Sequence, residues 1–278
     1  MRFSLKLAAV LLGLGVALPA NAATVSVAVA ANFTKVAEDL AAAFKAKTGD
    51  ELQLSFGATG QLYTQITQGA PFQVFLSADN TRPQKAVDEG FGVDGTVFTY
   101  AVGKLVLYGV AADVTEGADV LKAGGFQKLS IADPQTAPYG AAAVETLKSL
   151  GLYDALQPKI VTAQNISQAQ QFIESGSAEL GFVALSQVIG ADKGSQWLVP
   201  ADLYQPIAQD AVLLKTGVIT DIGTISVIVT TAGVVGALAI HWAVRLTPLK
   251  FLFERPALFW LVPDKKKQEP RLAMQPAE

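Results

Sequence analysis

The sequence predicts an α/β fold of two similar lobes, each built on a doubly wound, mostly parallel sheet, joined by two extended crossovers. Short apolar runs alternate with amphipathic helical stretches, the pattern of strands that pair in parallel through intervening helices. This alternation occurs twice, and a long extended run separates the two occurrences. A second extended run follows the second occurrence, where it can return the chain to the first lobe.

The first lobe shows a regular order of strands and helices. Apolar residues recur at helical spacing after the first strand, and the later strands are short apolar runs bounded by turn residues. The expected elements are strand Val25 to Ala30, helix Phe33 to Lys47, strand Leu52 to Phe56, turn Gly57 to Gly60, helix Leu62 to Thr67 and strand Val74 to Ser77.

The second lobe repeats this order between the two extended runs. Glycines follow its two longer helical stretches and are typical of helix ends. The expected elements are extended run Thr96 to Gly109, strand Leu129 to Ala132, helix Gly140 to Leu150, strand Ile160 to Val161, helix Ser167 to Glu174, strand Leu180 to Leu185 and extended run Leu203 to Leu214.

The N-terminus is typical of an exported protein. Arg2 and Lys6 precede the apolar run Leu7 to Leu18, and a small-x-small site ends at Ala22. These are the parts of a secretory signal peptide, so we expect the mature chain to begin at Ala23. A short membrane anchor is the alternative, although the run is short for a span.

A second apolar segment, Ile222 to Val244, contains no Asp, Glu, Lys or Arg. It is long enough to cross a bilayer with some tilt, whereas a buried helix would normally show a polar stripe. We therefore expect a transmembrane helix, with a core helix as the alternative. Seven basic residues follow the segment, which places the C-terminus in the cytoplasm: Arg245, Lys250, Arg255, Lys265, Lys266, Lys267 and Arg271.

These observations divide the chain into five parts. We expect a signal peptide at 1–22, the first lobe at 23–100 completed by about 205–217, the second lobe at 101–204, a transmembrane segment at 218–244 and a basic tail at 245–278.

Composition excludes several kinds of function. The 278 residues carry a net charge of −3, so no basic field favours nucleic acid. The chain has no cysteine, and its single histidine, His241, lies in the apolar segment. Thiolate metal sites, serine–histidine triads and histidine metal sites therefore have no residues in the exported part.

Four strand-to-helix junctions carry residues suited to an anion: Asn32, Thr59, Tyr139 and Ile166. Ligands of open α/β sheets bind at such junctions, where helix N-termini offer free N–H groups and a partial positive charge. None of the junctions contains a charged residue. A deprotonated dianion such as molybdate, tungstate or sulfate needs only donors, whereas hydrogen phosphate also needs an acceptor.

Each junction also has a purely structural interpretation. Asn32 is suited to an N-cap, and the glycines at 57 and 60 are suited to an ordinary turn. Tyr139 is also compatible with a surface aromatic residue and Ile166 with a core residue, in which case only its backbone N–H would meet a ligand.

Several motifs resemble the periplasmic molybdate-binding proteins of bacterial ABC importers. The resemblance runs from about Ala23 to Gly217, and its most specific parts are the block from Gly69-Ala70-Pro71 to Asp79 and the block from Ala132-Asp133-Pro134 to Gly140. The other matching motifs are Val29-Ala30-Ala31-Asn32-Phe33, Phe56-Gly57-Ala58-Thr59-Gly60 and Glu179-Leu180-Gly181-Phe182-Val183-Ala184.

The resemblance implies a two-lobed periplasmic binding protein of type II, with the ligand in the cleft. The family's ligand positions fall on Asn32, Thr59, Tyr139 and Ile166, to which we add the backbones of Ala31 and Ala58. No bare metal ion would bind: molybdenum or tungsten would be held only as the oxyanion, molybdate or tungstate. Some members have a small hydroxyl in place of Asn32, and some place a second tyrosine where this chain has Ala184.

The resemblance further implies a monomer that binds molybdate or tungstate in the periplasm and delivers it to an ABC permease, without cofactor or catalysis. Which of the two ions is preferred stays open, because they nearly match in size and charge. After Gly217 the family continues into helices that close the first lobe, and this chain departs from it. The tail is a fusion, a frameshift or an error in the gene model.

Two alternatives to a transport binding protein belong to other classes of function. The predicted transmembrane segment leaves open a membrane-tethered oxyanion sensor or scaffold that transports nothing. An enzyme on the same type of sheet has no support, since no paired carboxylates, activated nucleophile or metal cluster is present.

Overall fold

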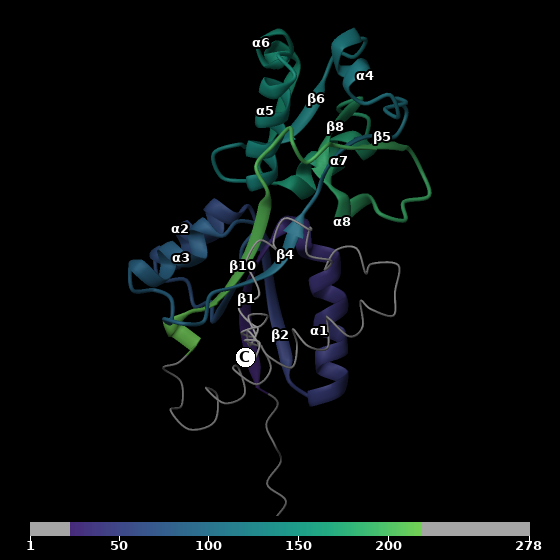
Figure 1. Cartoon of the computed structure of the whole chain (residues 1–278). Helices are drawn as coiled ribbons and strands as arrows, with labels where there is room; N and C mark the ends of the chain where they lie inside the picture. The colour runs from purple at the N-terminus through teal and green to yellow at the C-terminus, as the bar shows by residue number, and fades with distance from the viewer. Residues whose placement is uncertain (1–22, 218–278) are drawn as a thin grey trace, which may run out of the picture.

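The computed structural model describes residues 23–217. In this part of the chain, two five-stranded sheets form the centres of two lobes, one above the other in Figure 1. No helix between residues 23 and 217 is both long and apolar enough to span a membrane. The predicted signal peptide at 1–22 and the predicted transmembrane segment Ile222 to Val244 lie outside the described residues.

Lobe 1 is the part built on the first sheet. Its elements are β1 (Thr24–Ala30), η1 (Ala31–Phe33), α1 (Thr34–Thr48), β2 (Glu51–Gly57), α2 (Thr59–Thr67), β3 (Val74–Leu76), α3 (Thr81–Asp88), β4 (Phe98–Gly103), β10 (Ile207–Leu213) and η3 (Lys215–Gly217). The strand order is β2-β1-β3-β10-β4, with β1 parallel to β2 and β3, and β10 antiparallel to both its neighbours.

Alternation along β1 explains why helices cover both faces of this sheet. Val27 and Val29 pack with Phe33 on the face that α1 covers, whereas Ala28 packs with Leu62 of α2 on the other face. Successive strand residues point to opposite faces, so the consecutive apolar residues at 27–30 require cover on both.

Lobe 2 is built on the second sheet. Its elements are β5 (Leu105–Gly109), α4 (Ala118–Ala123), β6 (Leu129–Ala132), α5 (Pro138–Ser149), α6 (Tyr153–Leu156), η2 (Gln157–Lys159), β7 (Ile160–Ala163), α7 (Ile166–Glu174), β8 (Leu180–Ala184), α8 (Leu185–Val188) and β9 (Ser195–Leu198). The strand order is β7-β6-β8-β5-β9; β6 is parallel to β7 and β8, and β5 is antiparallel to β8 and β9.

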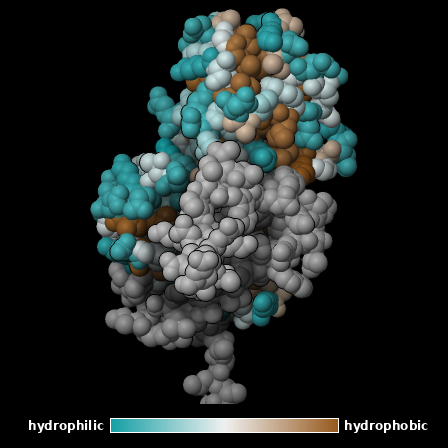
Figure 2. Space-filling model, in the orientation of Figure 1, coloured by the Kyte–Doolittle hydropathy of each residue, from teal (hydrophilic) through white to brown (hydrophobic). Residues whose placement is uncertain are grey.

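The core of lobe 2 lies along its central strands. Every residue of β5, β6 and β8 is buried, as expected for strands covered on both faces. Outside this core, the visible surface of the lobe is mostly hydrophilic with smaller apolar patches (Figure 2). The predicted α/β class with two sheets is therefore confirmed. The sheets are mixed rather than mostly parallel, because two of the four strand pairings in each sheet are antiparallel.

The first extended run divides between the two sheets. It forms β4 in lobe 1 and β5 in lobe 2, with Lys104 alone between them. The second run contains β10, which pairs with β3 and β4. The first crossover is thus a single residue between two strands, whereas residues 199–206 separate β9 from β10 on the second.

Among the hydrogen bonds between the lobes, four involve η1 or the loop before α5. Two join backbone and side-chain donors of lobe 1 to the loop before α5, and two join serines of lobe 2 to η1. They are Gly60 N–H to Thr136 O (2.8 Å), Arg82 Nη2 to Gln135 O (3.1 Å), Ser167 Oγ to Ala31 O (3.0 Å) and Ser186 Oγ to Asn32 O (2.8 Å).

Three helices begin earlier than the sequence indicated. The helix expected at Leu62 begins at Thr59, the one expected at Gly140 begins at Pro138, and the one expected at Ser167 begins at Ile166. The N–H groups in the first turn of a helix make no i→i−4 hydrogen bonds, so proline, glycine and threonine are tolerated there. The helical spacing of apolar residues, from which the helices were predicted, is therefore weak over the first turn. The short elements α3, α4, α6, α8 and β9 were not expected, because such brief segments carry little periodicity.

We predict that Gly181→Ala destabilises lobe 2 by about 1–3 kcal/mol, the usual cost of overpacking a core. A Cβ at Gly181 would lie 2.4 Å from the carbonyl oxygen of Ser130 on the neighbouring strand, so β6 and β8 would have to separate. Urea unfolding measures the loss. Gly125→Ala is the matched control, since its Cβ meets nothing within 4 Å, and equal stability of the two variants would contradict the packing argument.

Candidate functional site

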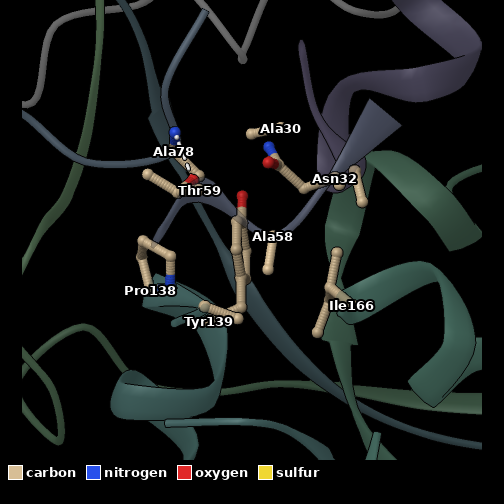
Figure 3. A pocket seen from close by; sticks show the side chains of 11 residues that line it. Ala30, Asn32, Ala58, Thr59, Ala78, Pro138, Tyr139 and Ile166 are labelled. Carbon is tan, nitrogen blue, oxygen red and sulfur yellow. Dashed lines mark hydrogen bonds between the residues drawn. The ribbon is translucent and has the colours of Figure 1, made fainter. Parts of the chain in front are cut away.

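The four predicted junction residues meet in one cavity between the lobes. Asn32 follows β1, Thr59 begins α2, Tyr139 lies in the first turn of α5, and Ile166 begins α7. All four are buried, with exposed fractions of 1–4%. The cavity is lined by Ala30, Ala31, Asn32, Gly57, Ala58, Thr59, Ala78, Ala137, Pro138, Tyr139 and Ile166 (Figure 3). The carboxyl ends of strands from both sheets therefore face one another across it.

The hydroxyl hydrogen of Thr59 has no acceptor within the part of the chain that the structure describes. Its Oγ1 accepts a hydrogen bond from the Ala78 N–H at 3.1 Å, which uses a lone pair and leaves the O–H to donate elsewhere. The next residue, Gly60, donates its N–H across the cleft to Thr136. A Cβ at Gly60 would lie 3.0 Å from the Thr136 Cα, so the glycine there lets the lobes approach.

Tyr139 reaches from lobe 2 into the centre of the cavity. Its oxygen points between the side chains of Asn32 and Thr59 in Figure 3 and accepts a hydrogen bond from Gln209 Nε2 at 3.1 Å. Burial raises the pKa of the Tyr139 phenol, and the nearby Tyr204 adds to the rise, while the neighbouring side-chain amides of Gln209 and Asn32 partly offset it. The phenol therefore stays protonated and able to donate at any physiological pH.

Asn32 does not cap a helix, contrary to its structural interpretation. It lies inside η1, and neither η1 nor α1 has a side-chain cap. Its Nδ2 donates to Gln209 Oε1 at 2.9 Å. Its Oδ1 is buried and has no partner among residues 23–217, a state that costs about 1–3 kcal/mol for a neutral group.

Ile166 is the first residue of α7 and is both a core residue and part of the cavity wall. The cap of this helix is Asn165, whose side chain accepts from the Gln168 N–H at 3.0 Å. The N–H of Ile166 has no partner within its own helix, because the first turn never does. Ile166 thus combines an apolar side chain in the core with a backbone N–H that makes no hydrogen bond within α7.

Among residues 23–217, no Lys, Arg, Asp or Glu lines the cavity. The positive potential instead comes from the N-termini of α2, α5 and α7, each worth about half an elementary charge. Arg82 and Asp79 pair with each other in an adjoining cleft on the crossover side. Within residues 23–217, no cluster of three or more His, Cys, Asp or Glu side chains is placed to hold a metal ion.

Gln209 is the main residue of this region that sequence reasoning missed. It bonds both Asn32 and Tyr139, yet it lies within strand β10 and is far in sequence from every predicted strand-to-helix junction. The available signal was weak: Gln209 and Asp210 are a polar pair within an otherwise apolar strand, and only their buried positions show that they require partners.

Comparisons with known proteins agree with this architecture. Residues 25–220 match the family model described as bacterial extracellular solute-binding protein. The molybdate-binding protein ModA of Rhodobacter capsulatus is 58% identical over 210 residues, 75% of this chain and 83% of that protein. ModA of Azotobacter vinelandii is 54% identical over 222 residues, 78% of this chain and 88% of that protein.

A solved structure shows the same fold. The Azotobacter vinelandii periplasmic molybdate-binding protein superposes with a TM-score of 0.70 at 40% identity, covering 79% of this chain and 96% of that one. Its family consists of binding proteins rather than enzymes. The chain belongs to the bacterial extracellular solute-binding proteins, in the group of the periplasmic molybdate-binding proteins.

Proposed function

We propose that the chain binds molybdate or tungstate in this cavity, in the periplasm, and delivers the ion to the permease of an ABC importer. The observation that carries the proposal is a buried cavity whose polar groups come from both lobes and whose lining has no charged side chain. An ion that carries two charges and no proton is satisfied by donors alone. Relatives that share more than half of their aligned residues with the chain are molybdate-binding proteins.

We propose Asn32, Thr59, Tyr139 and Ile166 as the residues that contact the ion, with the backbones of Ala31 and Ala58 beside them. Thr59 and Tyr139 would donate their hydroxyl hydrogens, and Ile166 its N–H. Two carbonyl oxygens of η1 already accept from Ser167 and Ser186. The lone pairs of these two carbonyl oxygens are thus partly occupied, whereas Asn32 Oδ1 is an acceptor with no partner among residues 23–217.

The donors come from two bodies, so we propose that binding and closure are coupled. The first body is 23–100 with 205–217, the second is 101–204, and the protein works as a monomer. The ion would have its full set of donors only when the lobes meet. The direct bonds from Gly60 and Arg82 to the loop before α5 would form in the same step.

For the part of the chain beyond the described residues, we propose an inner-membrane anchor at Ile222 to Val244. The support is in the sequence alone: the segment lacks charged residues and basic residues follow it. The anchor would keep the binding protein near its permease and would serve a tethered sensor equally well.

The ligand class is tested by calorimetry on the protein with molybdate, tungstate, sulfate and phosphate. We expect molybdate and tungstate to bind about fivefold to a hundredfold more tightly than phosphate, because leaving a phosphate proton without an acceptor costs about 1–3 kcal/mol. A preference for phosphate would contradict the proposed function.

Tyr139→Phe removes one hydroxyl donor with little change of shape. We expect molybdate affinity to fall by about 1.5–3 kcal/mol, the usual value of a hydrogen bond to a charged group. Titration of the variant beside Tyr153→Phe measures this. Tyr153 begins α6, away from the cavity, so its variant should bind as the wild type does. Equal affinity of all three proteins would remove Tyr139 from the site.

Cell fractionation tests the anchor. The full-length protein should sediment with the inner membrane and be released by detergent but not by high salt, because an apolar span is held by the bilayer and not by charge. The same chain truncated after Gly217 is the control and should appear in the periplasmic extract. Protein that still carries the segment Ile222 to Val244 but is found free in that extract would refute the anchor.

A further inference from the structure

Gln209 lies where both crossovers and both lobes meet. It belongs to β10, the returning crossover strand, and its side chain is 3% exposed. The register between β10 and β4 shifts at Gln209 and Asp210. A buried amide requires partners for both its oxygen and its nitrogen, so the identity of those partners determines how the side chain is oriented.

The two ends of the Gln209 amide bond different lobes. Its Oε1 accepts from Asn32 Nδ2 at 2.9 Å and from the Tyr100 hydroxyl at 3.2 Å, both in lobe 1. Tyr100 shares its single hydrogen with the Ser77 carbonyl oxygen, 2.9 Å away. With two donors on its oxygen, the amide is held with Nε2 toward lobe 2, where it donates to the Tyr139 oxygen at 3.1 Å.

This orientation decides what Tyr139 can do. A phenol has one hydrogen, and a glutamine oxygen in the same place would accept it. Because Gln209 presents an N–H, it occupies a lone pair of Tyr139 instead. No acceptor among residues 23–217 receives the Tyr139 hydrogen, whose oxygen points between Asn32 and Thr59 (Figure 3).

We propose that Gln209 is a positioning residue that keeps the Tyr139 hydrogen available to the bound oxyanion and fixes Tyr139 against Asn32 in the closed state. The inference rests on the proposed function of the cavity and adds a residue that acts through Tyr139. It also assigns a role to the crossover: the strand on which the lobes turn carries the amide that joins a donor of each lobe.

Gly103, on the other crossover, supports the assignment. A Cβ there would lie 2.3 Å from the Tyr139 oxygen and 2.7 Å from Gln209 Nε2. The end of β4 therefore leaves open the space in which these two atoms meet. Both crossovers contribute to the same hydrogen bond, one by an amide and the other by the absence of a side chain.

The test is a double-mutant cycle measured by molybdate titration. Gln209→Met keeps the length of the side chain and removes its hydrogen bonds, and we expect affinity to fall about tenfold or more. In a Tyr139→Phe background the same change should cost no more than about threefold, because coupled residues are not additive. Gln209→Glu offers only acceptors and adds a negative charge, so it should bind most weakly of all.

Two further variants serve as controls for the role of Gln209. Gln205→Met makes the same chemical change at an exposed position of the same segment and should bind as the wild type does. Gly103→Ala places a methyl group against the Tyr139 oxygen and Gln209 Nε2 without changing the Gln209 side chain. It should weaken binding in the wild type more than in the Tyr139→Phe background. Melting temperatures without ligand verify that each variant is folded.

The outcomes separate the two proposals. If the wild type binds molybdate but the effects of Gln209→Met and Tyr139→Phe simply add, Gln209 does not act through Tyr139 and the inference is overturned while the proposed function stands. A Gln209→Glu variant that binds as well as Gln209→Met would also overturn it. A wild type that binds no oxyanion would overturn both.

Discussion

The main constraint on this structure is the absence of a charged side chain in a cavity proposed to hold a dianion. A buried anion without a countercharge depends on hydrogen-bond donors, and each lobe has to present its own donors in a suitable orientation when the lobes close on the ion. One lobe cannot surround an ion from all sides. The division of the donors between two lobes, with helix N-termini on both sides, follows from this requirement.

Neutral donors also affect which ions the cavity can hold. A lysine or arginine would attract any anion of suitable size, whereas a rigid set of O–H and N–H groups accepts only an ion that has no proton to place. The polar groups next to the cavity serve the same end. Ser167 and Ser186 bond the carbonyl oxygens of η1, and Gln209 turns its nitrogen toward Tyr139.

The crossovers combine a mechanical and a chemical task. One residue separates β4 from β5, and residues 199–206 separate β9 from β10. The proposed rotation of the lobes would therefore take place near Gly103 on one crossover and near the start of β10, close to Gln209, on the other. Both residues adjoin Tyr139, so a movement about the crossovers would change the surroundings of this proposed ligand donor. Asp210, the neighbour of Gln209, accepts from Thr99 of β4 at 2.6 Å, and burial raises its pKa; it ties the two crossover strands together.

The sequence by itself determined the class of fold, the order of most strands and helices, and four residues of the candidate cavity. It could do so because apolar periodicity and strand-to-helix junctions are local, and because parallel sheets place their junctions at one edge. Thr59 and Ile166 were identified in this way even though the first turns of their helices were not. Gln209, Gly103 and the bonds from Gly60 and Arg82 could not be identified, since each depends on an atom from the other lobe or the other crossover. Only the tertiary structure brings residues 32, 103, 139 and 209 together, and which way a buried amide faces is decided by the partners that the fold supplies.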